Sequence, residues 1–204
     1  MATSHTQPGL QNSLYQPLSD SDVQRIADDA LRILAESGMH VFSKQAREAL
    51  VNAGADLQSD GLTVKMPRGL VEDCIASNPS SITLKSRDGE TDIHLEKNRV
   101  HYGTGGTAIY VLDLETGERR PSTTADVALC ARTMDRLENI HLFTINVFPN
   151  EIANTDHIDT NRFFHAFDNT TKHVMGGVYS MDGCEKVVEM AQTLAGGADA
   201  LAAE

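Results

Sequence analysis

The chain has 204 residues, enough for one ordinary domain or for a small domain followed by the opening of a larger one. Because 17 Lys and Arg residues face 29 Asp and Glu residues, the formal net charge is −12, and most of the surface would repel a phosphate backbone. We therefore expect no nucleic-acid partner. The sequence also lacks an apolar run of roughly 20 residues and a secretory signal, so it predicts a cytoplasmic protein without membrane contact.

The cysteines Cys74, Cys130 and Cys184 are far apart in the sequence and odd in number. Thiolate metal sites and disulfide frameworks place cysteines in closely spaced pairs. We therefore expect three buried thiols.

The first part of the chain is expected to be an arm followed by a small α+β region. Residues 1–17 are polar and without periodicity, which predicts a flexible N-terminal arm. Helical periodicity then begins at Ser19 and ends at Gly38, and two further helices are predicted, one capped by Ser43 and one opened by Pro67. Short alternating strands separated by turn residues follow them. Residues 18–120 are therefore expected to form an α+β preface with antiparallel hairpins.

After Pro121 the pattern changes to helices that alternate with apolar strands. Predicted strands cover residues 140–148 and 173–179, and predicted helices lie before, between and after them. Such alternation is typical of a parallel sheet with right-handed crossovers, so the fold class is α/β. A closed eight-stranded barrel needs about 250 residues. We therefore expect residues 121–204 to form the opening βα units of a TIM-type barrel that is incomplete in this chain.

The ends of the two apolar strands carry candidate binding residues. In parallel sheets and barrels the carboxyl ends of the strands face the active site, which selects Asn146, Phe148, Gly176, Gly177 and Tyr179. A quaternary ammonium group binds to aromatic faces, which Phe148 and Tyr179 could provide. The alternative is that these rings pack inside the barrel.

Two further tyrosines could also supply an aromatic face to such a group. They are Tyr102 and Tyr110, which flank a cluster of glycines. The same alternative, packing in the interior, applies to them.

The glycine cluster Gly103–Ala108 matches the pattern G-x-G-x-x-A of dinucleotide-binding loops. That loop must open a helix, whereas the residues that follow are β-branched, alternate like a strand and enter a turn. We therefore expect neither NAD nor FAD. Two interpretations remain: a tight bend, or a bend at which a ligand also approaches the backbone of Gly105, Gly106 and Thr107.

The residues indicate an architecture more clearly than they indicate a reaction. His157, His165 and His173 recur every eight positions, too far apart to share an ion, so we expect no metal site. No nucleophile–base pair, phosphate loop or pair of acids has a recognisable spacing. The sequence therefore predicts no catalytic residue.

One segment resembles a known family. HYGTGGTAIYVLDLETGERRPSTT, at His101–Thr124, is similar to the signature region of the trimethylamine:corrinoid methyltransferase family. The resemblance extends to LRILAESGMHV at Leu31–Val41, to MPRGLVEDCIASNPSSITLKSRD at Met66–Asp88 and to NTTKHVMGG at Asn169–Gly177. It is specific because the order, the spacing and the turn residues agree together.

The resemblance implies a (β/α)8 barrel that moves a methyl group from a methylated amine to the cobalt of a corrinoid. The corrinoid, a cobalamin, is carried by a separate small protein and is not tightly bound by the methyltransferase. Some relatives act on trimethylamine and use a pyrrolysine in the later barrel, whereas others act on quaternary amines such as glycine betaine. For a betaine, the backbone N–H groups of Gly105, Gly106 and Thr107 would hold the carboxylate.

A different interpretation is that the chain is a truncated, non-catalytic binding or assembly fragment of such an enzyme. Two βα units alone would expose apolar strand edges, which favour association. A homo-oligomer is therefore an open alternative.

Overall fold

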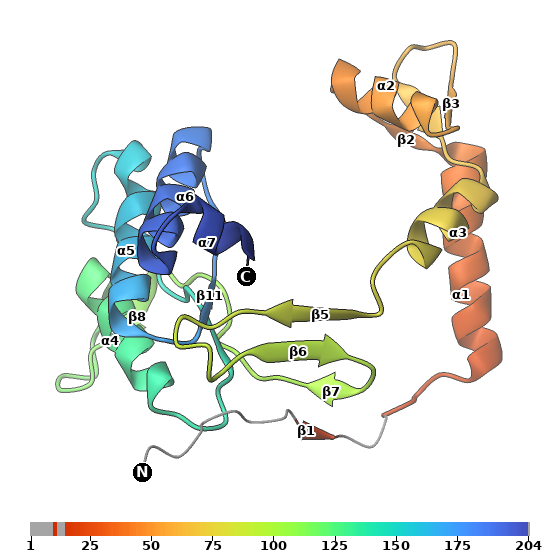
Figure 1. Cartoon of the computed structure of the whole chain (residues 1–204). Helices are drawn as coiled ribbons and strands as arrows, with labels where there is room; N and C mark the ends of the chain where they lie inside the picture. The colour runs from red at the N-terminus through yellow and green to blue at the C-terminus, as the bar shows by residue number, and fades with distance from the viewer. Residues whose placement is uncertain (1–9, 12–14, 204) are drawn as a thin grey trace. The chain divides into compact units, whose positions relative to one another are not determined.

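The computed structural model describes residues 10–11 and 15–203, and these divide into two compact units (Figure 1). One unit comprises residues 15–80. The other runs from Ser81 to the end of the described chain and includes the short strand β1 (Leu10–Gln11). Most of the predicted arm of residues 1–17 lies outside the described residues, and the predicted boundary after residue 120 remains a prediction.

The unit of residues 15–80 consists of helices around a small antiparallel sheet. Its helices are α1 (Asp20–Arg32), the π-helical turn η1 (Ile33–Ser37), α2 (Lys44–Asn52) and α3 (Arg68–Ala76). Its sheet has the order β2-β4-β3, with β2 at Met39–His40, β3 at Asp56–Leu57 and β4 at Thr63–Lys65.

Local capping explains where the helices of this unit begin. The hydroxyl of Ser19 accepts a hydrogen bond from Asp22 N (3.2 Å), and that of Ser43 accepts one from Ala46 N (3.3 Å). Each cap satisfies a backbone N–H that the first helical turn leaves without a partner. Gly38 then ends the first helical segment with φ +70°, a conformation that glycine adopts without strain. The three predicted helices are confirmed.

The second unit begins with antiparallel pairs of strands. They are β5 (Ser81–Leu84) with β6 (Ile93–Glu96), β7 (Arg99–Val100) with β1, and β8 (Tyr110–Leu112) with β9 (Arg119–Pro121). The predicted antiparallel hairpins are confirmed by the β5–β6 and β8–β9 pairs. The pairing of β1 with β7 was not predicted.

The remainder of this unit alternates helices with parallel strands. In chain order the elements are α4 (Thr124–Asp135), β10 (Leu142–Thr144), η2 (Thr155–His157), α5 (Ile158–Asn169), β11 (His173–Met175), α6 (Met181–Ala195) and α7 (Ala198–Ala203). Strands β10 and β11 pair in parallel, with Phe143 opposite Val174. The predicted parallel arrangement after Pro121 is therefore confirmed for these two strands.

A third segment runs parallel to β10 on its other side. Isolated bridges join Gly103 to Leu142 and Ala108 to Val147, both in the parallel direction. The sequence analysis predicted that the residues after the glycine cluster alternate like a strand and enter a turn. It did not predict that the cluster itself pairs with β10, since that pairing joins segments far apart in the chain.

The core of the second unit lies between β10 and the helices α4 and α5. Phe143 on β10, and Ile145 and Val147 in the extended segment that follows it, alternate with more exposed residues and are buried. They pack with a set of small and aromatic residues from the two helices, namely Val127, Ala131, Phe163 and Ala166. The intervening residues, among them Thr144 and Asn146, are half-buried. The strand was predicted to be buried on both faces, but in the described chain it is fully buried on one.

The prediction of buried thiols is wrong. Cys74 is exposed, because α3 belongs to the unit with little interior, and Cys130 and Cys184 are half-buried at the edge of the packed helices. Within residues 10–11 and 15–203, no three His, Cys, Asp or Glu side chains are grouped so that they could hold a metal ion. In the same residues no helix has both the length and the apolar character to cross a membrane.

Candidate functional site

Hydrogen bonds align the ends of the three parallel segments. Ala108 N donates to Asn146 O (2.8 Å), Phe148 N donates to Ala108 O (2.8 Å), and Ile145 N donates to Met175 O (2.9 Å). The segments therefore end at the same side of the sheet. We call this side the carboxyl edge, formed by residues 107–108, 146–148 and 177–179; Gly105 and Gly106 lie just before it, between the bridges at Gly103 and Ala108.

An aromatic pair stands at the carboxyl edge. The rings of Phe148 and Tyr179 lie 6.0 Å apart between centroids at an interplanar angle of 78°, which is an edge-to-face contact. The Phe148 ring is half-buried, whereas Tyr179 is 58% exposed. Of the four aromatic residues predicted as candidates, the structure brings these two together.

Hydrogen bonds from Ser122 and Asn150 fix the backbone around Phe148. Ser122 is fully buried, and its hydroxyl donates to Phe148 O (2.6 Å) and lies 3.2 Å from Ala108 O. The amide nitrogen of Asn150 donates to Ile109 O (2.8 Å). These bonds connect the glycine segment to the end of β10, so they fix the backbone that carries the Phe148 ring.

Arg120 and Asp126 fix the beginning of α4 behind the same edge. The guanidinium donates to both carboxylate oxygens of Asp126, at 2.8 and 2.9 Å. Arg120 is the main cause that lowers the pKa of Asp126 to about 2, and hydrogen bonds from Thr123 lower it further, while burial acts in the opposite direction. This ion pair therefore stabilises the first turn of the helix.

Gly103 serves packing, whereas Gly105 and Gly106 have no such role in the described chain. A Cβ at Gly103 would lie 2.6 Å from Leu142 Cγ, so glycine permits the close pairing with β10. A Cβ at Gly105 or Gly106 would meet no atom within 4 Å, and neither residue has a positive φ. The chain bends at Gly106. Neither a positive φ nor close packing requires glycine at these two positions, so the predicted bend and the predicted approach of a ligand both remain predictions.

Asn146 and Gly177 also reach the carboxyl edge. The side-chain oxygen of Asn146 is buried and has no hydrogen-bond partner within the part of the chain that the structure describes. A Cβ at Gly177 would meet nothing within 4 Å. Enclosed acceptors without a partner are rare in folded proteins, and they mark places where a partner is expected to bind.

The structure places Tyr102 and Tyr110 elsewhere. Tyr102 O accepts hydrogen bonds from His141 N (2.7 Å) and Leu142 N (3.4 Å), so Tyr102 lies at the amino end of the parallel segments. Ala108, in contrast, pairs with Val147 at the carboxyl edge. Tyr110 lies on β8 with the guanidinium of Arg119 4.0 Å from its ring centroid.

Two buried charged residues were missed by the sequence analysis. Asp159 and Arg162 lie one turn apart on α5, and each is 1% exposed. Asp159 Oδ2 accepts a hydrogen bond from Tyr179 N (2.8 Å), and the Arg162 guanidinium lies 5.1 Å from the Tyr179 ring centroid. The available signal was their spacing, because they share a helix face with the apolar residues Ile158, Phe163 and Ala166.

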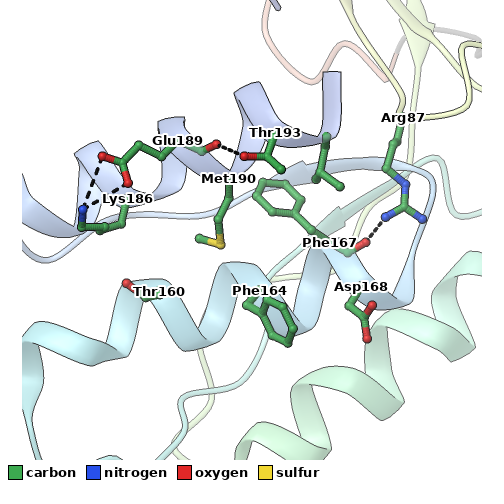
Figure 2. A pocket seen from close by; sticks show the side chains of 10 residues that line it. Arg87, Thr160, Phe164, Phe167, Asp168, Lys186, Glu189, Met190 and Thr193 are labelled. Atoms are coloured by element: carbon green, nitrogen blue, oxygen red, sulfur yellow. Dashed lines mark hydrogen bonds and ion pairs between the residues drawn. The ribbon is translucent and has the colours of Figure 1, made fainter. Parts of the chain in front are cut away.

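A separate groove lies between α5 and α6 (Figure 2). It has a volume of about 360 Å³, and Phe167 and Met190 point into it from the two helices. Lys186 pairs with Glu189 (3.1 Å) at one end, and Arg87 donates to Phe167 O at the other. None of the residues predicted for the site lines this groove, so the aromatic pair belongs to a different surface.

The parallel strands and the aromatic carboxyl edge indicate an α/β protein with a candidate binding site at its strand ends, and comparison with known sequences identifies the family. The family model of the trimethylamine methyltransferases (MTTB) matches residues 2–203, so the chain belongs to this family. The family predicted from the sequence segments is therefore confirmed.

Individual relatives act on two kinds of methylated amine. The chain is 33% identical, over 90% of its length, to trimethylamine methyltransferase MttB of Desulfitobacterium hafniense strain DSM 10664 / DCB-2. It is 26% identical, over 92% of its length, to glycine betaine methyltransferase of D. hafniense strain Y51, and 26% identical, over 81%, to MttB1 of Methanosarcina mazei. The chain covers 37%, 38% and 33% of these three relatives, respectively.

Proposed function

We propose that this chain forms the opening part of a methyltransferase that takes a methyl group from a methylated amine and delivers it to the cobalt of a corrinoid on a separate protein. Family membership supports the methyl transfer, and the names of the relatives support the amine. The observation that carries the proposal is the edge-to-face pair of Phe148 and Tyr179 at the ends of two parallel strands.

The proposed architecture of the complete protein is a TIM-type barrel. Strands β10 and β11 are parallel and joined through α5, and the glycine segment 103–108 adds a third parallel segment beside β10. Parallel strands linked by helices are the repeating unit of such a barrel, and active sites in barrels lie at the carboxyl ends of the strands. The location of the aromatic pair agrees with this rule.

The aromatic pair is suited to a positively charged methylated nitrogen. Aromatic faces attract quaternary ammonium groups, since the ring carries negative charge density on its faces. For a betaine, the backbone N–H groups of Gly105, Gly106 and Thr107 would hold the carboxylate. For protonated trimethylamine, the enclosed oxygen of Asn146 offers an acceptor for its single N–H.

The task of these residues in the reaction is orientation. The corrinoid supplies the nucleophilic cobalt when its carrier protein docks, and the side chains of the carboxyl edge would aim one methyl–nitrogen bond outward. Gly177 leaves the edge without side-chain bulk, and Gly105 and Gly106 do the same for the segment just before it, which would allow a large partner to approach. The proposed partners are therefore a small methylated amine and a corrinoid-binding protein.

The test is a methyl-transfer assay with the complete gene product, a reduced corrinoid protein and a panel of methylated amines. We expect methylcobalt formation, seen as a change in corrinoid absorbance, with one of the amines. Tyr179→Leu and Phe148→Leu should each raise the KM for that amine roughly tenfold. Phe164→Leu, an exposed aromatic residue outside the carboxyl edge, is the matched control and should leave the KM unchanged.

Absence of transfer from every amine, with a folded protein and a reduced corrinoid, would contradict the enzyme proposal. Amine binding without transfer would instead support the second interpretation, a non-catalytic binding or assembly fragment.

A further inference from the structure

Side chains of α5 bind the backbone of the loop that carries Tyr179. The loop runs from Gly176 to Ser180, between β11 and α6. The Tyr179 ring is 58% exposed, so packing around the ring is not sufficient to fix its orientation. Contacts to the backbone of the loop must therefore help to hold the ring against Phe148.

Asp159 holds the carboxyl side of this loop. Its Oδ2 atom accepts hydrogen bonds from Tyr179 N (2.8 Å) and Ser180 N (3.3 Å). Ser180 is the N-cap of α6, so the carboxylate lies at the amino end of that helix, where a negative charge is stabilised. Two successive backbone groups of the loop are thereby bound to one buried side chain.

Arg162 holds the amino side of the loop. Its Nη1 atom donates to Gly177 O (3.3 Å), and its guanidinium carbon lies 5.1 Å from the centroid of the Tyr179 ring. The guanidinium therefore contacts both the loop backbone and the ring. Asp159 and Arg162 lie one turn apart, so a single face of α5 controls the loop from Gly177 to Ser180.

Two unfavourable contributions to folding stability accompany these buried charges. Both side chains are 1% exposed, and Asp159 Oδ1 and Arg162 Nε have no hydrogen-bond partner within the described residues, so the burial of these charges is only partly compensated. In addition, a Cβ at Gly183 would collide with the Asp159 carboxylate, so the first turn of α6 must contain glycine, a poor helix former. A purely apolar contact between α5 and the loop would avoid both costs.

We propose that Asp159 and Arg162 are positioning residues of the amine site, which set the Tyr179 ring edge-to-face with Phe148. The assignment rests on the proposed function, because it takes the ring pair as the surface that receives the methylated nitrogen. It adds residues that touch neither the amine nor the corrinoid and that act through Tyr179.

Nuclear magnetic resonance of the tyrosine rings in the whole chain measures this role directly. The chain has four tyrosines and no tryptophan, so few ring signals overlap after 13C labelling of tyrosine. Tyr179→Phe identifies the Tyr179 signals, and Phe148→Leu identifies the part of their shift that comes from the neighbouring ring. The variants to compare are Asp159→Ala, Asp159→Asn, Arg162→Met and Arg162→Lys.

We expect Asp159→Ala and Arg162→Met to remove the shift that Phe148 produces on Tyr179. Asp159→Asn keeps an acceptor oxygen and should restore most of it. The matched control is Asp168→Asn, an exposed carboxylate on the same helix, which should change nothing. If Asp159→Ala or Arg162→Met does not fold, Arg162→Lys decides, because lysine lacks the planar guanidinium that contacts Gly177 O and the Tyr179 ring. A Tyr179 shift unchanged in folded Asp159→Ala and Arg162→Met, or unchanged in Arg162→Lys, would overturn the proposal.

Titration with tetramethylammonium chloride separates this inference from the proposed function. In the unmodified chain the salt should shift the Tyr179 signals, and Asp159→Ala should weaken that binding roughly tenfold. No shift in the unmodified chain would overturn the assignment of the ring pair to an amine. The methyl-transfer assay tests only the proposed enzyme activity. If no methyl group is transferred, the NMR result on the position of the Tyr179 ring is unaffected.

Discussion

The two units of the molecule are stabilised in different ways. From Ser81 onward a packed core surrounds Phe143 and Ile145, with several apolar side chains almost without solvent contact. In residues 15–80 the buried apolar side chains are Ala55 and Val64, while Ile26 and Phe42 are exposed. The first unit relies on caps, short strands and ion pairs, whereas the second has an interior that can hold a binding site rigidly.

The largest expected effect comes from the core of the second unit. Phe143→Ala should lower the free energy of unfolding by about 3–5 kcal/mol, because it removes a fully buried ring and leaves a cavity. Urea denaturation followed by circular dichroism measures the change. The matched control is Phe42→Ala in the first unit, where the ring is 77% exposed and the change should stay within about 0.5 kcal/mol. Equal costs for the two substitutions would contradict the comparison.

A second prediction separates structural glycines from glycines of the site. Gly176→Ala would bring a Cβ within 2.9 Å of the Phe163 ring, so we expect a loss of about 1–3 kcal/mol in unfolding free energy. Gly177→Ala meets nothing within 4 Å and should leave stability unchanged. In the complete enzyme, however, Gly177→Ala should lower kcat/KM for the amine. Thermal unfolding and the methyl-transfer assay, applied to both variants, distinguish the two roles.

Features that depend on residues close together in the sequence could be predicted, whereas contacts between distant segments could not. The caps at Ser19 and Ser43 depend on residues three positions away, and the pattern of apolar residues predicted both parallel strands. The pairing of Gly103 with Leu142 connects distant segments, and the sequence contains no local signal for its register.

The candidate site was predicted in part for the same reason. The rule that strand ends face the site selected Phe148 and Tyr179, and the structure pairs their rings. Asp159 and Arg162 were missed because an analysis of periodicity treats charged positions on a helix as solvent-exposed. Tyr102 was selected for its ring alone, and its position at the amino end depends on the parallel register with β10.

The third prediction concerns pH and the ion pair at the start of α4. Arg120 holds the pKa of Asp126 at about 2, below the ordinary value of 3.8. A carboxyl group with a lowered pKa in the folded state contributes stability above its unfolded pKa and loses it as the pH falls toward the folded pKa. We therefore expect Asp126→Asn to cost about 1–2 kcal/mol at pH 7, after a discount for the partial exposure of Arg120.

Urea denaturation at several pH values checks the sign of this effect. The difference between Asp126→Asn and the unmodified chain should be constant above about pH 5 and should shrink between pH 4 and pH 2. Asp56→Asn, an exposed carboxylate in the first unit, is the control. A difference that grows as the pH falls would contradict the assigned ion pair.

The smallest expected effect tests the first unit. Ile26 lies on α1 and is 56% exposed, so Ile26→Lys should change the free energy of unfolding by no more than about 0.5 kcal/mol. The change also adds a positive charge to a strongly acidic chain, which should not reduce solubility. If Ile26→Lys instead costs as much as a core substitution, this apolar face of α1 must be covered in solution by a surface that packs against it. The first unit would then depend on that contact for its stability. The proposed difference between a first unit stabilised by caps and ion pairs and a second unit stabilised by a buried core would no longer hold.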